Sequence, residues 1–144
     1  MPPVAGPQDT LHATCVAIAK RGLLILGPSG SGKSSLGLAL MALGAKLVAD
    51  DRTTLINKAG KLVAKCPPPI RGLIEAYGMG LLRAETEPSA TIALVVDLGQ
   101  HESQRLPPFR HTFLCGVDCD LVLGQNGPHF PSFLLAYMMG GRQA

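Results

Sequence analysis

The residues best suited to chemistry form the run Gly27-Pro28-Ser29-Gly30-Ser31-Gly32-Lys33-Ser34, which fits the pattern G-x-x-x-x-G-K-[ST] of a phosphate-binding loop. Glycines in such a loop let successive backbone N–H groups point inward at a phosphate, and the helix that follows adds its positive N-terminal end. Lys33 is expected to reach the terminal phosphates of a nucleotide, and the Ser34 hydroxyl is expected to bind Mg²⁺. We therefore expect Lys33 to contact the ligand and not the core.

Two adjacent carboxylates, Asp50 and Asp51, form a second candidate cluster after the next predicted strand. A carboxylate at the end of a strand beside a phosphate loop commonly anchors Mg²⁺, directly or through water. Its neighbour can accept a proton from an attacking hydroxyl group. A solvated acidic turn is the alternative, because Asp is common where strands end. With the phosphate loop upstream, the functional interpretation is favoured.

The elements that must position these residues predict an α/β phosphate-loop domain with a mixed β-sheet and few helices. We expect strands at 10–19, 23–26, 45–49, 53–57, 62–66, 79–82, 91–98 and 113–123, the last of them broken by Gly116. We also expect a helix at 35–43, a short helix or turn at 70–77, an apolar helix or turn at 132–139, and loops at 83–89 and 99–110. The turn Lys20-Arg21-Gly22 predicts an antiparallel pair of the first two strands. The crossover through the helix favours a parallel pair of strands 23–26 and 45–49, which brings Asp50 and Asp51 beside the loop.

Composition indicates one folded domain and argues against several classes of function. Of the 144 residues 47% are hydrophobic and 16% charged, and no Trp is present, so the core must be aliphatic. Residues 1–9 contain three prolines and are predicted to be a disordered tail, with a single domain at 10–144. A net charge of +3 is too small and too scattered to indicate a nucleic-acid partner. No signal segment and no membrane-length apolar run is found, so no membrane partner and a cytoplasmic location are expected.

The cysteines fit the same compartment, because they are expected to be free thiols and not a disulfide framework. The chain has four, Cys15, Cys66, Cys115 and Cys119. Cys115 and Cys119 have His111 and His129 nearby in the sequence, so a metal site is conceivable, but the spacing matches no common zinc pattern. Buried small hydrophobic side chains are the favoured interpretation.

Several segments together resemble the catalytic domain of HPr kinase/phosphorylase. The resemblance rests on Lys20-Arg21-Gly22 leading into a strand, on the phosphate loop, on Leu47-Val48-Ala49-Asp50-Asp51-Arg52, and on Pro67-Pro68-Pro69 followed by Glu75, Gly78 and Gly80-Leu81-Leu82. It covers residues 12–98 and fades beyond them. The chain resembles the short form of the family, which is the catalytic domain alone. The fold so implied is of the HPr kinase/PEP carboxykinase type.

The resemblance implies a serine kinase that uses ATP, or pyrophosphate, with Mg²⁺. Its substrate is a serine of HPr, a small carrier protein of the sugar phosphotransferase system. The reverse activity removes the phosphoryl group with inorganic phosphate and releases pyrophosphate. The resemblance also implies a homo-oligomer, which in this family is a hexamer.

Roles for individual residues follow from the same resemblance. Asp51 corresponds to the proton acceptor of the kinase reaction and to the proton donor of phosphorolysis, and His12 corresponds to a catalytic histidine that can tune Asp51 electrostatically. The remaining implied roles are Lys33 on the terminal phosphates, Ser34 and Glu75 as Mg²⁺ ligands, and Asp50 in metal binding or orientation.

Departures from the family pattern leave two other classes open. Tyr77 stands where the family signature has an arginine, and residues 99–144 diverge. A phosphate-loop nucleotide-binding regulatory protein that has lost protein-kinase activity is one alternative. A small-molecule kinase is the other, but it usually needs a lid with several arginines, and Arg83, Arg105 and Arg110 are few and scattered.

Overall fold

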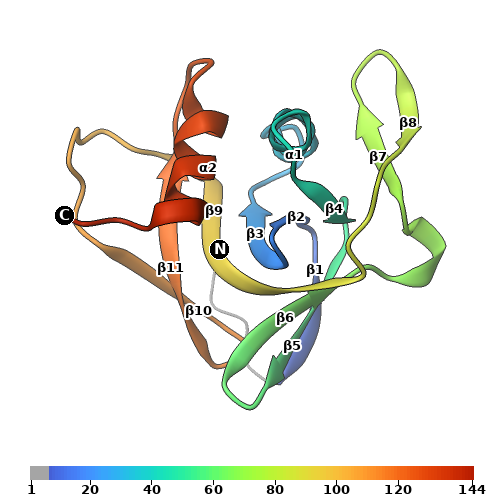
Figure 1. The fold of residues 1–144 in the computed structure, drawn as a ribbon, viewed down its shortest axis with the longest axis horizontal. Helices are drawn as coiled ribbons and strands as arrows, with labels where there is room; N and C mark the ends of the chain where they lie inside the picture. The colour runs from blue at the N-terminus through green and yellow to red at the C-terminus, as the bar shows by residue number, and fades with distance from the viewer. Residues whose placement is uncertain (1–6) are drawn as a thin grey trace.

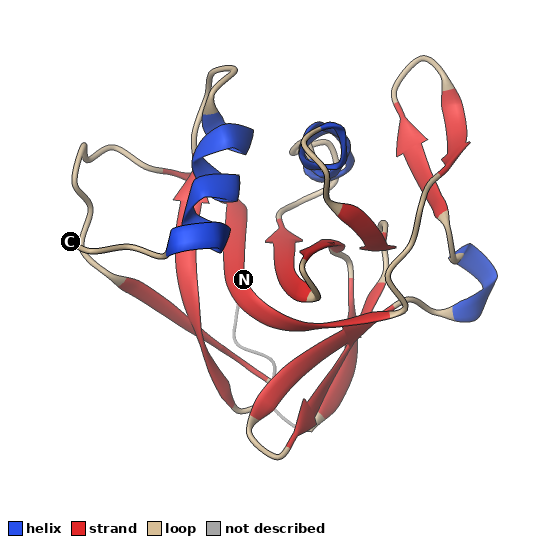
Figure 2. Ribbon diagram, viewed as in Figure 1, coloured by secondary structure: helices blue, strands red, loops and turns tan. Residues whose placement is uncertain are grey.

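The computed structural model of the protein describes residues 7–144. Within that range, one large curled mixed sheet is accompanied by two α-helices and a separate hairpin (Figure 1, Figure 2). The strands of the large sheet are β1 (Gln8–Leu11), β2 (Thr14–Ile18), β3 (Arg21–Leu26), β4 (Lys46–Ala49), β5 (Thr53–Lys58), β6 (Lys61–Lys65), β9 (Ser89–His101), β10 (Arg110–Leu114) and β11 (Val117–Gly124). The other elements are α1 (Lys33–Ala42), the 3₁₀ turn η1 (Pro68–Ile70), the hairpin strands β7 (Leu73–Ala76) and β8 (Gly80–Arg83), and α2 (Phe130–Gly140). The predicted mixed α/β class with few helices is confirmed.

The large sheet is ordered β1-β5-β6-β9-β3-β2-β4, and β9 is the strand on which it branches. One edge of β9 pairs with β3 in parallel. The other edge pairs first with β6, through residues 89–91, and then in parallel with β11, which continues into β10. The carboxyl ends of β3, β9 and β11 therefore point the same way, and the phosphate loop follows β3 at that edge.

The predicted direct pairing between strands 23–26 and 45–49 is wrong. β2 lies between β3 and β4 and pairs antiparallel with both, so β3 and β4 run parallel without touching. The hairpin turn between β2 and β3 lies at Ala19 and Lys20, whose φ values of 52° and 64° match the turn type that two-residue hairpins favour. Because β2 and β9 occupy both edges of β3, β4 cannot pair with β3, and it pairs with the other edge of β2.

Consecutive residues of the central strands point to opposite faces of the sheet and enter two separate cores. On β3, Leu23 and Ile25 pack with α1 and α2, whereas Leu24 and Leu26 pack where β5, β6 and β10 curl over the other face. All four side chains are buried. This explains why the strand sequences are apolar without alternation, as in sheets covered on both sides.

Three sequence expectations are corrected at the level of elements. Residues 8–9, expected in the tail, belong to β1, which pairs with β5, while the tail prediction for residues 1–6 lies outside the described residues. The strand expected at 10–19 is two strands that break at His12 and Ala13. Residues 73–76, expected in a helix or turn, form β7, because Ile74 and Ala76 are buried, Glu75 points outward and β8 supplies a partner.

The predicted β5–β6 hairpin and the helices are confirmed. The hairpin of β5 and β6 and the helices α1 and α2 lie within about two residues of their expected bounds.

β9 is longer than expected and takes residues 99–101 from the predicted loop, and Cys115 and Gly116 form the turn that separates β10 from β11. All four cysteines are free and buried. No helix among residues 7–144 is long and apolar enough to cross a membrane.

Candidate functional site

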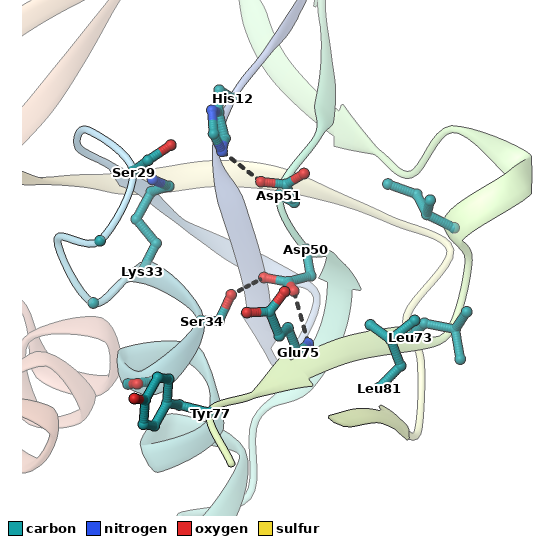
Figure 3. A pocket seen from close by; sticks show the side chains of 14 residues that line it. His12, Ser29, Lys33, Ser34, Asp50, Asp51, Leu73, Glu75, Tyr77 and Leu81 are labelled. Atoms are coloured by element: carbon teal, nitrogen blue, oxygen red, sulfur yellow. Dashed lines mark hydrogen bonds and ion pairs between the residues drawn. The ribbon is translucent and has the colours of Figure 1, made fainter. Parts of the chain in front are cut away.

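A cavity of about 540 Å³ lies between the phosphate loop, the start of β2 and the β7–β8 hairpin (Figure 3). Its lining includes polar and charged side chains from four separate segments of the chain: His12, Ser29, Lys33, Ser34, Asp50, Asp51 and Glu75. Apolar lining comes from Ile70, Leu73 and Leu81, and Tyr77 adds an exposed aromatic ring. The fold thus brings the residues that sequence reasoning selected into one concave site.

The phosphate loop has the backbone shape that its glycines allow. Gly30 and Gly32 have φ values of 81° and 98°, which other residues rarely adopt, and a side chain on either would meet no atom within 4 Å. Backbone conformation and not crowding therefore requires glycine at both positions. Gly32 is also the N-cap residue of α1, so the positive end of this helix faces the cavity.

Lys33 is buried within the phosphate loop and belongs to neither hydrophobic core. It is 7% exposed, and its Nζ donates to the carbonyl oxygens of Gly27, at 2.8 Å, and Pro28, at 3.1 Å. Ser31 Oγ is also buried and has no hydrogen-bond partner among the described residues. The loop therefore contains an ammonium group and a hydroxyl group that can turn to phosphate oxygens.

Asp50 is the best-anchored carboxylate of the site and is 6% exposed. Its Oδ1 accepts hydrogen bonds from Thr14 Oγ1, at 2.8 Å, and Ser34 Oγ, at 2.6 Å. Its Oδ2 accepts one from the backbone N–H of Glu75, at 3.0 Å. One carboxylate thus joins β2, the first turn of α1 and the β7–β8 hairpin.

Asp51 has a different environment although it is the next residue. Its side chain is 64% exposed and contacts Nε2 of His12, whose side chain is 51% exposed. Asp51 has a φ of 68°, and this left-handed backbone turns its side chain away from that of Asp50 (Figure 3). The two aspartates thus face different partners, and Asp51 is the one that a large substrate can reach.

Glu75 lies across the cavity from the phosphate loop. Its side chain points toward Ser34 and Asp50 in Figure 3. Hydroxyl and carboxylate oxygens from these three residues are ligands that Mg²⁺ accepts in proteins. The donor set therefore fits a magnesium ion held between the loop and the hairpin.

Sequence reasoning missed Thr14, which is fully buried. Its hydroxyl donates to Asp50 and accepts from the backbone N–H of Asp51, at 3.4 Å, so it lies between the two carboxylates. A threonine on a strand carries no signal of such a role, because strands favour threonine in general. No cluster of three metal-ligating His, Cys, Asp or Glu side chains is found among residues 7–144, and this holds for Cys115, Cys119, His111 and His129.

Comparison with known proteins identifies the family. The profile of the HPr Serine kinase C-terminal domain matches residues 5–107, more than half of the chain. The chain belongs to this family. It is 37% identical to the HPr kinase/phosphorylase of Cupriavidus necator, and 36% identical to that of Ralstonia pickettii, over 115 residues in each case. The alignments cover 72% of this chain and 36% of each relative, so the chain spans little more than a third of the curated relatives' length.

A solved structure has the same fold as this chain. The structure of the Hpr(Ser) kinase/phosphatase from Coxiella burnetii superposes with a TM-score of 0.77 at 24% identity, and covers 91% of this chain and 94% of the other. The profile match confirms the family that the sequence resembles, and this superposition confirms the fold.

Proposed function

We propose that this chain transfers the terminal phosphoryl group of ATP, or of pyrophosphate, to a serine hydroxyl of HPr. The observation that carries the proposal is the meeting of the His12–Asp51 pair and the Ser34–Asp50 contact on one cavity at the phosphate loop. The family and the names of the similar proteins support the same substrates.

Asp51 is the proposed general base. Its exposed carboxylate accepts the proton of the serine hydroxyl as the oxygen attacks phosphorus, and His12, when protonated, stabilises the carboxylate form. In phosphorolysis Asp51 returns a proton to the serine oxygen while inorganic phosphate attacks, and pyrophosphate leaves. Lys33 and the loop N–H groups stabilise the charge on the transferred group once Lys33 Nζ exchanges a loop carbonyl for a phosphate oxygen.

Ser34, Asp50 and Glu75 are proposed to hold Mg²⁺. When bound, the ion neutralises phosphate charge and fixes the orientation of the phosphate oxygens. Asp50 also orients the Ser34 hydroxyl through their hydrogen bond, and the buried Thr14 hydroxyl holds Asp50 in place by donating to the same carboxylate oxygen.

The wider setting is proposed from the family resemblance. A cytoplasmic location agrees with four free cysteines in the described part of the chain. Self-association, to a hexamer as the family resemblance implies, stays a prediction that sedimentation velocity tests directly.

A nucleotide-binding regulatory role without protein-kinase activity is the second candidate. It is favoured by Tyr77, which is 98% exposed at the cavity where the family signature has an arginine. A tyrosine there supplies no positive charge to phosphates.

The deciding experiment incubates the purified chain with HPr, Mg²⁺ and ATP labelled on its terminal phosphate. Label on a serine of HPr supports the kinase. The Asp51→Asn variant, purified in the same way, is the control, and its failure to label HPr would show that no contaminating enzyme is responsible. Measurable ATP binding without labelled HPr supports the regulatory role. Phosphorolysis is tested by adding inorganic phosphate to labelled HPr and measuring labelled pyrophosphate.

A further inference from the structure

A second cavity, of about 460 Å³, lies beyond the carboxyl ends of β9 and β11 and has no assigned role. Its lining includes an aromatic ring and amide, imidazole and guanidinium groups, from His101, Gln104, Arg105, Gln125, Asn126 and Phe133. Glu102 and Ser103 complete the lining, and the Glu102 carboxylate is paired with Arg110. β9 and β11 lie side by side with α2 next to them (Figure 1). The cavity is therefore made by the segments that follow two parallel strands and by the first turn of α2.

This cavity lies near the phosphate loop along the same sheet edge. Asp97 on β9 pairs with Leu26, the last residue of β3 before the loop. Two residues later, a side chain on Gly99 would be 3.4 Å from Cδ of Pro28, so β9 packs directly against the loop. His101, which lines the cavity, is four residues beyond Asp97 on the same strand, roughly 13 Å at the rise of a strand.

The two cavities lie on opposite sides of the loop in the order of the strands. Asp51 and His12 follow β4 and precede β2, on one side of β3, whereas β9 and β11 are on the other. Phosphoryl transfer requires the attacking and leaving oxygens to be roughly in line through phosphorus. If Asp51 activates the acceptor on the β4 side, the leaving nucleoside diphosphate must extend toward β9.

The wall of the second cavity is also held in place. Arg110 donates two hydrogen bonds to the carboxylate of Glu102, at 3.1 and 3.0 Å, and the backbone N–H of Glu102 donates to Gly124, at 2.9 Å. The Glu102 side chain is 6% exposed. The start of the 102–109 segment is thus tied to both β10 and β11.

We infer that this second cavity binds the nucleoside part of the donor nucleotide, a deepening that rests on the proposed function. Phe133 is 55% exposed and offers a ring face on which a base can stack. The amides of Gln125 and Asn126 can donate to and accept from the edge of the base, and Arg105 supplies a cation for the phosphate nearest the sugar. ATP then spans both sites, whereas an inorganic polyphosphate occupies the loop alone.

The test compares two probes on the whole chain by calorimetry: ATP with Mg²⁺, and inorganic tripolyphosphate with Mg²⁺. Phe133→Ala is expected to weaken ATP binding about tenfold, which is within the range for loss of an aromatic stacking partner, and to leave tripolyphosphate binding unchanged. Asn126→Ala is a second variant with the same expected direction. Phe113→Ala is the matched control, because Phe113 is 53% exposed on β10 and lines no described cavity.

The outcomes separate this inference from the proposed function. Selective loss of ATP affinity in the Phe133 and Asn126 variants supports the nucleoside site. Unchanged ATP affinity in both, or an equal loss for both probes, overturns it while the phosphate loop stands. Tripolyphosphate that fails to bind the unaltered chain overturns the phosphate-loop proposal itself. Melting curves verify that each variant is folded. The two substitutions lie in different segments, so if one variant fails to fold, the other still tests the inference.

Discussion

Asp50 accepts three hydrogen bonds in a buried position, whereas the carboxylate of the neighbouring Asp51 is exposed and pairs with Nε2 of His12. Asp50→Asn is expected to lower the free energy of unfolding by about 2–3 kcal/mol, because hydrogen bonds to a charged acceptor are lost. Asp51→Asn is expected to cost less than about 1 kcal/mol, since an exposed ion pair contributes little.

Asp51→Asn is expected to have a small effect on stability and a large effect on activity, because it should remove turnover and retain ATP binding. Asparagine tolerates the left-handed backbone at position 51, so the variant isolates the carboxylate charge. Urea unfolding and ATP titration measure both effects. Weak ATP binding by Asp51→Asn would assign this residue to the metal instead of to proton transfer.

Lys33→Ala tests the ammonium group of the loop. It is expected to abolish phosphoryl transfer, and also to cost about 1–2 kcal/mol of stability because two hydrogen bonds to loop carbonyls are lost. Lys33→Met retains most of the apolar stem and serves as the control for packing. Transfer at the normal rate in either variant would contradict the role of the loop.

At the residue scale, spacing alone was enough to select the loop and the aspartate pair. Lys33 and Ser34 have fixed places in the loop pattern, and Asp50 and Asp51 follow the next strand. Thr14 could not be selected, because its part in the site depends on β2 lying between β3 and β4. Such a contact is a consequence of strand order, which has no local signal.

At the scale of elements, the β7–β8 hairpin determines what faces the phosphate loop from across the cavity. Tyr77→Arg restores a cation at this tip, and we expect ATP affinity to rise about threefold at low salt and the gain to fade at high salt. Met79→Arg is the matched control, since Met79 is 77% exposed on the same hairpin but does not line the cavity. Equal gains in both variants would show a general charge effect and no local one.

The segment after β9 carries a pH dependence. Hydrogen bonds from Arg110 lower the pKa of Glu102, so the folded state favours the carboxylate. The resulting stability is present above about pH 4.3, the ordinary pKa of glutamate, and is lost as the pH falls through the lowered folded value. Glu102→Gln should therefore lower Tm at pH 7 and have a smaller effect near pH 3. Glu85→Gln is the control, because the Glu85 side chain is 81% exposed and should show no comparable change.

Elements with a local signal were predictable, and those defined by a distant partner were not. The β5–β6 hairpin follows from its turn residues, and α1 follows from the loop that precedes it. β7 was missed because four residues cannot distinguish a strand from a helical turn until β8 is known to pair with them. The extension of β9 to His101 likewise depends on β11.

At the scale of the whole molecule, the sheet is covered on both faces, by helices on one and by its own curled strands on the other. An apolar run without alternation, such as residues 23–26, indicates that a strand is buried but does not say what covers it. Cys15 and Cys119, which lie far apart in the chain, pack into the same core on the curled side. That core is where the closure can be probed chemically.

The thiols report on this closure. Burial raises the pKa of Cys119 to about 11 and also raises the pKa values of Cys15, Cys66 and Cys115. Because the thiolate is the reactive form, all four should react slowly with a thiol reagent at pH 7.5 and rapidly after unfolding in guanidinium. Cys119→Ser is the control for assignment. One fast thiol in the folded chain, lost in that variant, would mean that β10 and β11 open from β5 and that the curled face is not a permanent part of the fold.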